Sequence, residues 1–455
     1  MTKPTGTPSP HARSASREAA LARQRLSLMV AMADVIGQGG YRTATVADVI
    51  GRAGVSRKTF YKHFANKQEC FLSTYDLVAA DAIRRVERAY QDAAGWPGRV
   101  EAAIHMLFQT AIDNPGAVRL ITVEIGAVGP AGIKFRERSI VRYQRFISDA
   151  AKLAPGDGRI SDIAARAVAG GLSSVLHRRV SAGERAELLG LVPDLVSWVT
   201  SYYPTPPAVA RARAGDARAR GPLTGGRAPG TLAPHSALNA RRGLARGNHN
   251  VSRSFVVHSQ RERILDAVAN LTATRGFAAL GIDDIAEEAA VSLNAFYEHF
   301  ADKEDALLVA YELGHAKSLA TVQQAYAAEN QWRHAVRAGI SALFHFLASE
   351  PAFAHVALVD AMTATPYTAK RSHAGVSDFA QLLLPGLAEM PESARPPAVM
   401  IEAIVGGIFE LCLQHALRGT IHRLPELTAP ATYLALAPFL GGPQAARVAT
   451  KSPQR

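Results

Sequence analysis

The chain has 455 residues, of which 48% are hydrophobic and 20% charged, so it holds enough apolar material for roughly two to four folded domains. Its formal net charge of +12 favours a polyanionic partner wherever that charge lies on a binding surface. Two cysteines, Cys70 and Cys412, exclude a disulfide framework, and we expect both to be reduced core residues. The sequence lacks the apolar core of a signal peptide and a membrane-length apolar run, which predicts a cytoplasmic protein.

A helix-turn-helix pattern occupies the start of the chain, after a polar tail at 1–20. Apolar residues recur at spacings of three and four over 28–36, as in an amphipathic helix. Thr45 suits the N-cap of a short helix, Gly54 a turn that needs no Cβ, and Ser56 the N-cap of a second helix. Helix, short turn and helix together form the helix-turn-helix arrangement.

The second helix of this motif has two different faces. Phe60 and Phe64 fall together at 100° per residue and should anchor the helix to the core. Lys58 and Lys62 point the opposite way, with Arg57 near the helix start. Such cations can reach guanine acceptors in a major groove. A solvated helix face is the alternative for the lysines.

The segment from Thr45 to Asp76, TVADVIGRAGVSRKTFYKHFANKQECFLSTYD, resembles the N-terminal domain of the tetracycline-repressor (TetR) family. The resemblance rests on Gly-Val-Ser, Phe-Tyr-Lys-His-Phe and Asn-Lys, and covers roughly residues 25–75 and 260–311. It implies a dimeric repressor whose C-terminal helices bind a small ligand and move the DNA-reading heads. It also implies which residues contact DNA in the first head: Thr45, Tyr61, His63 and Lys67 at phosphates, and Arg57, Lys58, Thr59 and Lys62 at bases, with Ser56 at the helix start.

The whole unit recurs 236 residues later. VSRKTFYKHFANKQE at 55–69 matches VSLNAFYEHFADKED at 291–305. NPGAVRLITVE at 114 matches EPAFAHVALVD at 350, and AVAGGL at 167 matches AIVGGI at 403. Three separated matches at one offset indicate an internal duplication. Because the apolar spacing is helical nearly throughout, the sequence predicts an all-α protein. The resemblance implies two TetR-like units, each a three-helix helix-turn-helix domain followed by a helical bundle.

The predicted organisation has seven parts. They are a disordered tail at 1–20, a first helix-turn-helix domain at 21–75, a first ligand and dimerisation domain at 76–204, a linker at 205–254, a second helix-turn-helix domain at 255–311, a second ligand and dimerisation domain at 312–442, and a disordered tail at 443–455. The linker holds nine arginines and one aspartate and has few large apolar residues, so we expect it to be flexible. Its arginines either keep the chain soluble or follow DNA phosphates as a basic arm.

The second head differs from the first in charge. Residues 41–75 contain six basic and two acidic residues, a net charge of +4, whereas residues 277–311 contain one basic and eight acidic residues, a net charge of −7. The reading face changes from Arg57, Lys58, Thr59 and Lys62 to Leu293, Asn294, Ala295 and Glu298. We therefore expect the first head to dominate DNA binding and the second to be weak or differently specific. Candidate contacts of the second head are Ser292, Asn294, Tyr297, His299 and Lys303.

Apolar helices predict how the units assemble and what they bind. The stripes at 160–180 and 396–417 should pack together as an intramolecular pseudo-dimer, with a homodimer of chains as the alternative. The effector is expected to be a small hydrophobic or amphipathic molecule. Candidate ligand-binding residues are His105, Phe108, Glu124, Tyr143, His177, Phe344, His355 and Asp360.

The sequence favours no catalytic class. It contains no nucleophile elbow, phosphate loop or metal-ligand spacing, so we expect no cofactor, no metal and no enzyme. The alternative function is a small-molecule sensor or interaction protein with impaired DNA binding. Repression and activation both stay open, because the sign of control depends on where the DNA site lies relative to a promoter.

Overall fold

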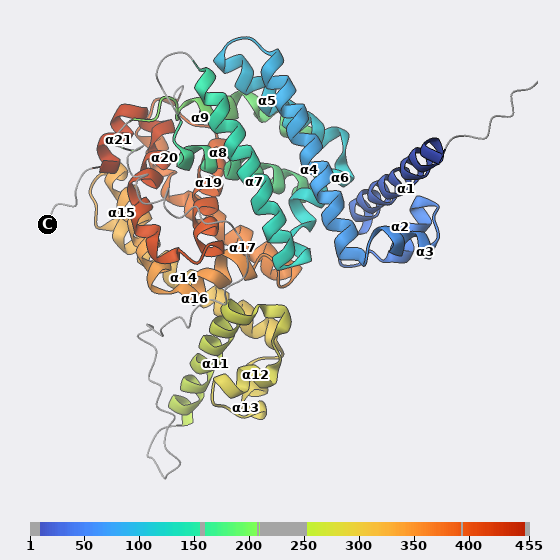
Figure 1. The fold of residues 1–455 in the computed structure, drawn as a ribbon. Coiled ribbons are helices and arrows are strands. Elements are labelled where there is room, and N and C mark those ends of the chain that lie inside the picture. Colours follow the sequence, from blue (N-terminus) through green and yellow to red (C-terminus); the bar gives the residue numbers. More distant parts are fainter. Residues whose placement is uncertain (1–9, 155–159, 207–208, 210–252, 393–394, 451–455) are drawn as a thin grey trace, which may run out of the picture.

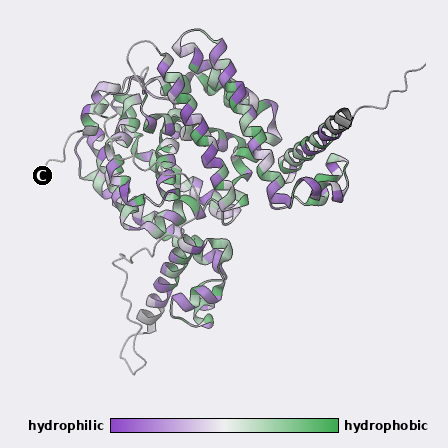
Figure 2. Ribbon diagram, viewed as in Figure 1, coloured by the Kyte–Doolittle hydropathy of each residue, from purple (hydrophilic) through white to green (hydrophobic). Residues whose placement is uncertain are grey.

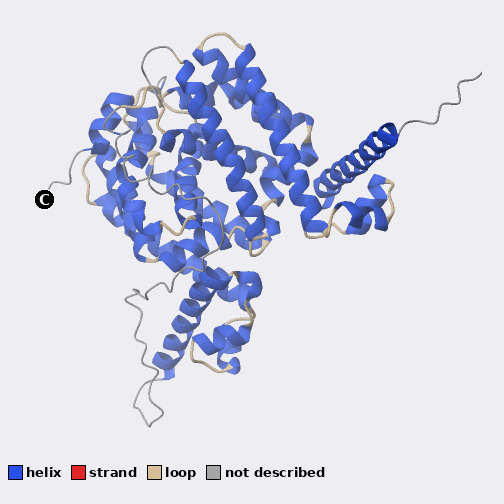
Figure 3. Ribbon diagram, viewed as in Figure 1, coloured by secondary structure: helices blue, strands red, loops and turns tan. Residues whose placement is uncertain are grey.

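The structure, a computed structural model, describes residues 10–154, 160–206, 209, 253–392 and 395–450. Over these residues it consists of helices and loops without strands, which confirms the all-α prediction (Figure 3). Hydrophilic and hydrophobic residues are interspersed along the helices, as expected where each helix buries one face (Figure 2). Two small helical heads project from one common body at separate places (Figure 1).

The first unit is followed in blue to green in Figure 1. Its helices are α1 Pro10–Gly39, α2 Val46–Ala53, α3 Arg57–His63, α4 Lys67–Asp92, α5 Trp96–Asp113, α6 Pro115–Arg119, α7 Pro130–Ala150, α8 Asp162–Ala182 and α9 Val192–Thr200. A π-helical turn, Leu120–Glu124, follows α6. Helices α1 to α3 form the head, and the remainder forms half of the body.

The second unit is coloured from yellow to red. Its helices are α11 Arg253–Arg275, α12 Ile282–Glu288, α13 Leu293–His299, α14 Lys303–Ala327, α15 Trp332–Ser349, α16 Pro351–His355, α17 Pro366–Asp378, α18 Pro385–Ala388, α19 Ala398–Leu417, α20 Thr428–Leu440 and α21 Gly442–Thr450. The π-helical turn recurs at Val356–Asp360. Helices α3 and α13, α5 and α15, and α6 and α16 begin and end 236 residues apart, which confirms the duplication.

The repeated sequence signals account for the repeated boundaries. Ser56 and Ser292 each accept a hydrogen bond from the third residue after them and so begin the reading helices. Proline at the first helical position begins α6 and α16 as well as α7 and α17. These local signals lie at equivalent positions in both units, so the equivalent helices of the two units begin at equivalent residues.

Helices α8 and α19 pack against each other at the centre of the body, as the two apolar stripes predicted. A Cβ atom at Gly407 would lie 2.7 Å from the carbonyl oxygen of Ala167, and one at Gly171 would strike Ala403. The missing side chains therefore allow the two backbones to approach closely. Helix α19 is the one described helix long and apolar enough to cross a membrane, but 78% of that window is buried inside the protein, as in a core helix.

The predicted ends of the units need correction. Helix α1 begins at Pro10, inside the predicted tail at 1–20. Helix α21 covers most of the predicted tail at 443–455, because Ala445 and Ala449, one turn apart, are 0% and 1% exposed. Thr205 and Val209, assigned to the linker, are 8% and 3% exposed and belong to the first unit. The linker segment 210–252 lies outside the described residues.

Candidate nucleic-acid interface and pockets

The reading helix α3 has a fixed orientation in the first head. Phe60 and Phe64 are 0% and 1% exposed, and the Arg25 guanidinium lies 4.3 Å from the Phe64 ring centroid. The Ser56 hydroxyl accepts a hydrogen bond from the Thr59 backbone N–H at 3.1 Å. Anchoring by two rings and a cap leaves the opposite face of the helix for contact with a partner.

That opposite face is cationic and open to solvent. Arg57, Lys58 and Lys62 are exposed, and Tyr61 keeps 48% of its surface exposed. None of the three cations has a carboxylate within 4.0 Å among the described residues. Long cationic side chains without ion-pair partners are suited to phosphate and guanine contacts.

Thr45 and His63 already have partners within the head. The Thr45 hydroxyl accepts a hydrogen bond from the Asp48 backbone N–H at 3.2 Å and completes a capping box at the start of α2. The His63 Nε2 lies 3.4 Å from Gln24 Oε1. Desolvation, Lys62 and Arg25 all lower the pKa of His63, so at neutral pH it is a neutral hydrogen-bonding group.

Lys67 and Lys303 hold their own heads together. Lys67 Nζ donates to the carbonyl oxygens of Tyr41 and Ala44, both at 2.8 Å. The equivalent Lys303 donates to the carbonyl of Phe277 at 3.3 Å and that of Leu280 at 2.7 Å. Both ammonium groups also lie over an aromatic ring. The resemblance implies a phosphate contact for Lys67, and Lys303 is a candidate DNA contact of the second head. In the structure two of the three N–H donors of each lysine are used internally.

The second head keeps the scaffold and loses the cationic face. Ser292 caps α13 and Phe296 is 0% exposed, as in the first head. Asn294 and Glu298 are exposed, and Tyr297 keeps 57% of its surface exposed. Within residues 277–311, all of which the structure describes, the single cation is Lys303, which is engaged by backbone carbonyls. His299 is half-buried, and its Nε2 has no hydrogen-bond partner there.

The turn between the two helices of the motif also differs. Gly54 ends α2 at a φ of 65°, in the left-handed region that glycine adopts without strain. Its counterpart Ala290 has a φ of 51°, the one positive φ of a non-glycine residue in the described chain. The second head therefore retains the turn at a conformational cost that the first head avoids.

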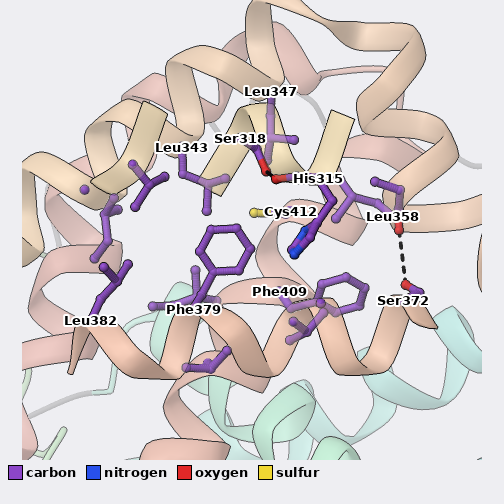
Figure 4. A pocket seen from close by; sticks show the side chains of 18 of the residues that line it. His315, Ser318, Leu343, Leu347, Leu358, Ser372, Phe379, Leu382, Phe409 and Cys412 are labelled. Carbon is purple, nitrogen blue, oxygen red and sulfur yellow. Dashed lines mark hydrogen bonds between the residues drawn. The ribbon is translucent and has the colours of Figure 1, made fainter. Parts of the chain in front are cut away.

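A cavity of about 110 Å³ lies in the body of the second unit (Figure 4). Its walls come from α14, α15, α17 and α19 and are mainly apolar, with Leu343, Phe379 and Phe409 among them. His315 and Ser318 from α14 add polar groups, and the His315 Nε2 lies 2.8 Å from Asp378 Oδ2. Such a lining suits an apolar molecule that carries one polar group.

A smaller cavity of about 60 Å³ occupies the corresponding place in the first unit. Val100, Ile104 and Leu107 line it, and their counterparts 236 residues later, Val336, Ile340 and Leu343, line the larger one. The two cavities are therefore equivalent by the repeat. Residues that narrow the first cavity are smaller in the second: Ala103 becomes Gly339 and Phe146 becomes Leu382.

Most of the predicted ligand residues lie away from these two cavities, and Tyr143 alone lines one of them. His105 is exposed, and Phe108 and Phe344 are fully buried in the core. Glu124 accepts hydrogen bonds from the Tyr41 backbone N–H and from Arg119. His355 pairs with Asp360 at 2.7 Å. His177 stacks on His373 with ring centroids 4.1 Å apart, where the two units meet.

The predicted ligand residues are mostly polar and do not include the apolar residues that line the cavities. A signal existed in the repeat, since apolar residues at paired positions on several helices mark equivalent internal surfaces. His315 was missed because it replaces Ala79 of the first unit and has no counterpart there. Among the described residues, no group of three or more His, Cys, Asp or Glu side chains is placed to hold a metal ion.

The family described as bacterial regulatory proteins, tetR family, matches residues 28–74 and 264–310, which are the two heads. The chain is 25% identical over 101 residues to nucleoid occlusion factor SlmA of Marinomonas sp. (strain MWYL1), covering 22% of this chain and 51% of that protein. It is 29% identical over 98 residues to HTH-type transcriptional activator FasR of Mycolicibacterium smegmatis (strain ATCC 700084 / mc(2)155), covering 22% and 45%. The matches thus span about half the length of these relatives.

A solved structure of the transcriptional regulator FadR from Bacillus subtilis in complex with stearoyl-CoA is 15% identical, with a TM-score of 0.35, and covers 38% of this chain and 96% of that one. The family assignment rests on the two head matches, which coincide with the two helix-turn-helix motifs of the structure. The chain therefore belongs to the TetR family of bacterial regulatory proteins and carries the family's DNA-binding domain twice, in tandem.

Proposed function

We propose that this chain is a ligand-responsive, DNA-binding transcription regulator, with the first head as its main DNA reader. The contrast between the two reading helices carries the proposal. Helix α3 presents Arg57, Lys58 and Lys62 to solvent, whereas α13 presents Leu293 and Glu298. Because affinity for duplex DNA depends largely on cations that displace counterions from phosphates, the basic head meets the requirement far better than the acidic one.

The second head is weak or differently specific in this proposal. Asn294 and Glu298 are exposed and have the chemistry to read adenine and cytosine edges. Its acidic surface supports the rival function, a sensor or interaction protein with impaired DNA binding. Repression is the proposed sign of control, and activation is the alternative, since the relative FasR is named as an activator.

The effector in this proposal is a small hydrophobic or amphipathic molecule bound in the cavity of the second unit. Ala357 and Leu358 of the π-helical turn form part of the cavity wall. Val356 of the same turn is buried in the core of the second head. A molecule that displaced this turn would therefore move the base of the second head.

The residues that follow this turn contact the first head. Arg42, which precedes α2, donates to the carbonyl oxygens of Thr363 at 3.4 Å and Ala364 at 2.9 Å. Its counterpart in the second head is Ala278, which has no such donor. A molecule in the second unit's cavity would thus also affect the first head, the proposed DNA reader, because residues 356–364 contact the cavity and both heads.

Selection of bound sequences from random duplex DNA by the full chain tests the DNA-binding role. We expect one asymmetric or half-site motif, which the Lys58→Ala/Lys62→Ala variant no longer selects. In this variant the slope of log affinity against log salt concentration should fall in magnitude by about 2. The matched control is Asn294→Ala/Glu298→Ala at the equivalent positions. Loss of the motif only in the control would reverse the assignment of the heads, and no motif at all would favour the sensor. A palindrome of two like half-sites would mean that two chains assemble, each using its first head.

Cavity binding is tested with the amphipathic dye 1-anilinonaphthalene-8-sulfonate. A Cβ atom at Gly339 would lie 3.4 Å from Val322, an ordinary contact, so Gly339→Leu should fill the cavity without a backbone clash. We expect this variant to lose most of the dye fluorescence, while Ala103→Leu at the equivalent position of the first unit keeps it. Equal loss in both variants, or in neither, would contradict the choice of the second cavity.

A further inference from the structure

The seam between the units, formed by α8 and α19, has pseudo-twofold symmetry. A Cβ atom at Gly170 would strike Glu410, and one at the equivalent Gly406 would strike Ser174, the equivalent of Glu410. Each of these contacts across the seam therefore has a counterpart, in which each residue is replaced by the residue 236 positions away in the other unit. This symmetry predicts which side chains would meet if two like units paired in the same geometry.

The charges that meet across the seam are divided between the units by sign. Glu410 of the second unit is 1% exposed, and its carboxylate lies 2.5 Å from Arg166 and 2.8 Å from Arg136 of the first unit. Arg166, also 1% exposed, pairs in addition with Glu137 of its own unit. Burial alone would raise the pKa of Glu410, but the two guanidinium groups bring it below its ordinary value, so the group stays ionised.

A second cluster repeats this division. The carboxylate of Glu402 on α19 lies 3.4 Å from Arg179 and 3.7 Å from Arg178, both on α8. The side chain of Glu402 is 11% exposed, whereas that of Arg178 is 56% exposed. Four arginines of the first unit thus face two glutamates of the second, and in each pair the carboxylate is at least as buried as the arginine.

Equivalent positions of the other unit lack or reverse these charges. Arg166 corresponds to Glu402, and Ser174 corresponds to Glu410. The remaining cations of the first unit, Arg136, Arg178 and Arg179, correspond to Ser372, Gln414 and His415. The cationic face therefore belongs to the first unit alone, and the two carboxylates that face it across the seam, Glu402 and Glu410, belong to the second unit alone.

Like pairs would bring equal charges together. Two first units would place Arg179 of one against Arg166 of the other, where Glu402 now stands. Two second units would place Glu402 of one against Glu410 of the other, without the arginines that now neutralise them. A buried charge whose partner is removed is strongly destabilising, and a like charge in its place adds repulsion.

We propose that this seam is a specificity device: the second unit's dimerisation face accepts a first unit and rejects a second copy of itself. The partner is the first unit of the same chain, joined by four arginines that no second unit carries. The distribution of charge stabilises the unlike pair and lowers the stability of both like pairs, most of all that of two second units, because in two first units Arg166 and Arg179 keep the carboxylates of Glu137 and Glu184 of their own unit. The pairing of the two units is independent of whether either head binds DNA.

A charge-swap series in the intact chain tests the seam, with amide hydrogen exchange of α8 and α19 reporting its opening. Glu402→Arg should make these amides exchange at least about tenfold faster, because it places a third cation beside Arg178 and Arg179. Adding Arg179→Glu should restore protection to within about threefold of the wild type. Glu426→Arg, which reverses an exposed carboxylate paired within its own unit, is the control and should leave the seam unchanged. Unchanged amide exchange in Glu402→Arg, or a failure of the added Arg179→Glu to restore protection, would overturn the proposal.

A second experiment measures directly which units pair with each other. A protease site introduced within residues 210–252 allows the folded chain to be cut into its two units. Isotopically labelled and unlabelled cut preparations are then mixed at the lowest urea concentration at which labelled and unlabelled units exchange partners. Native mass spectrometry should detect exchanged pairs made of one first and one second unit. First–first or second–second pairs above about one in a hundred would refute the selectivity, since loss of a buried partner is worth more than a hundredfold.

Discussion

Replacing Ala290 by glycine should stabilise the second head. Ala290 occupies the turn of the helix-turn-helix motif at a φ of 51°, and Gly54 occupies the same turn of the first head at 65°. In this region the Cβ of an L-residue crowds its own backbone, which costs about 1–2 kcal/mol. Ala290 is exposed, so its methyl group contributes little burial to offset that cost.

Glycine also has a cost, because its unfolded chain is more flexible by about 0.5–1 kcal/mol. The net gain from Ala290→Gly should therefore be about 0.5–1 kcal/mol. The hydrogen bond from the Val291 backbone N–H to the Ala286 carbonyl, 3.0 Å, closes the turn in the structure and is retained by glycine. The reciprocal change, Gly54→Ala, should destabilise the first head by a similar amount, since it imposes the same strain.

Amide hydrogen exchange measures these effects head by head, which matters because a chain of several domains does not unfold in one step. We expect α12 and α13 amides to exchange about two- to fivefold more slowly in Ala290→Gly, and α2 and α3 amides to exchange faster in Gly54→Ala. Each variant is the control for the other, because the opposite head should not change. Faster exchange in Ala290→Gly would refute the strain argument, as would an unaffected first head in Gly54→Ala.

Three further changes test the roles assigned to single residues. Lys303→Met removes two hydrogen bonds to carbonyls and should lower the free energy of unfolding of the second head by about 2 kcal/mol by the same exchange measurement; an unchanged head would show that the lysine is not structural. Gly407→Leu should separate α8 from α19 and lower the thermal midpoint, because its Cβ would lie 2.7 Å from the Ala167 carbonyl oxygen, whereas Gly190→Leu, with no atom within 4 Å, should not. Glu298→Lys should strengthen DNA binding at low salt and raise the salt slope by about 1, and no change would argue that α13 does not face DNA.

The heads could be predicted from sequence because their signals are local. Ser56, Gly54 and the pair Phe60 and Phe64 define the cap, the turn and the buried face of a short helix within residues 54–64. The faces predicted for Lys58 and Lys62 are exposed, as the helical periodicity requires. The role of Lys67 could not be predicted in this way, because the carbonyls that it binds lie 23 and 26 residues earlier in the chain.

The cavities depend on packing between helices far apart in sequence. His315 on α14 meets Asp378 at the end of α17, 63 residues later, and lines a space that α15 and α19 complete. A single helix pattern records that a face is apolar but not whether the opposing faces fill the space between them. The seam charges were missed for a similar reason, because Arg166 and Glu410 are 244 residues apart and each lies in an apolar stripe.

Duplication within one chain permits changes that a symmetric dimer could not keep. In a homodimer any substitution occurs in both subunits. If each subunit carried carboxylates at the positions of Glu402 and Glu410, the carboxylate at the first position of one subunit would meet that at the second position of the other across the axis. In the fused chain each change occurs once, which allows the second unit to hold the buried carboxylates, the larger cavity and the acidic head. If unlike units alone can pair, each assembly carries one basic and one acidic reading helix. The selectivity of the seam would then decide the form of the DNA target, because a closed chain offers a single cationic reading helix to a single half-site.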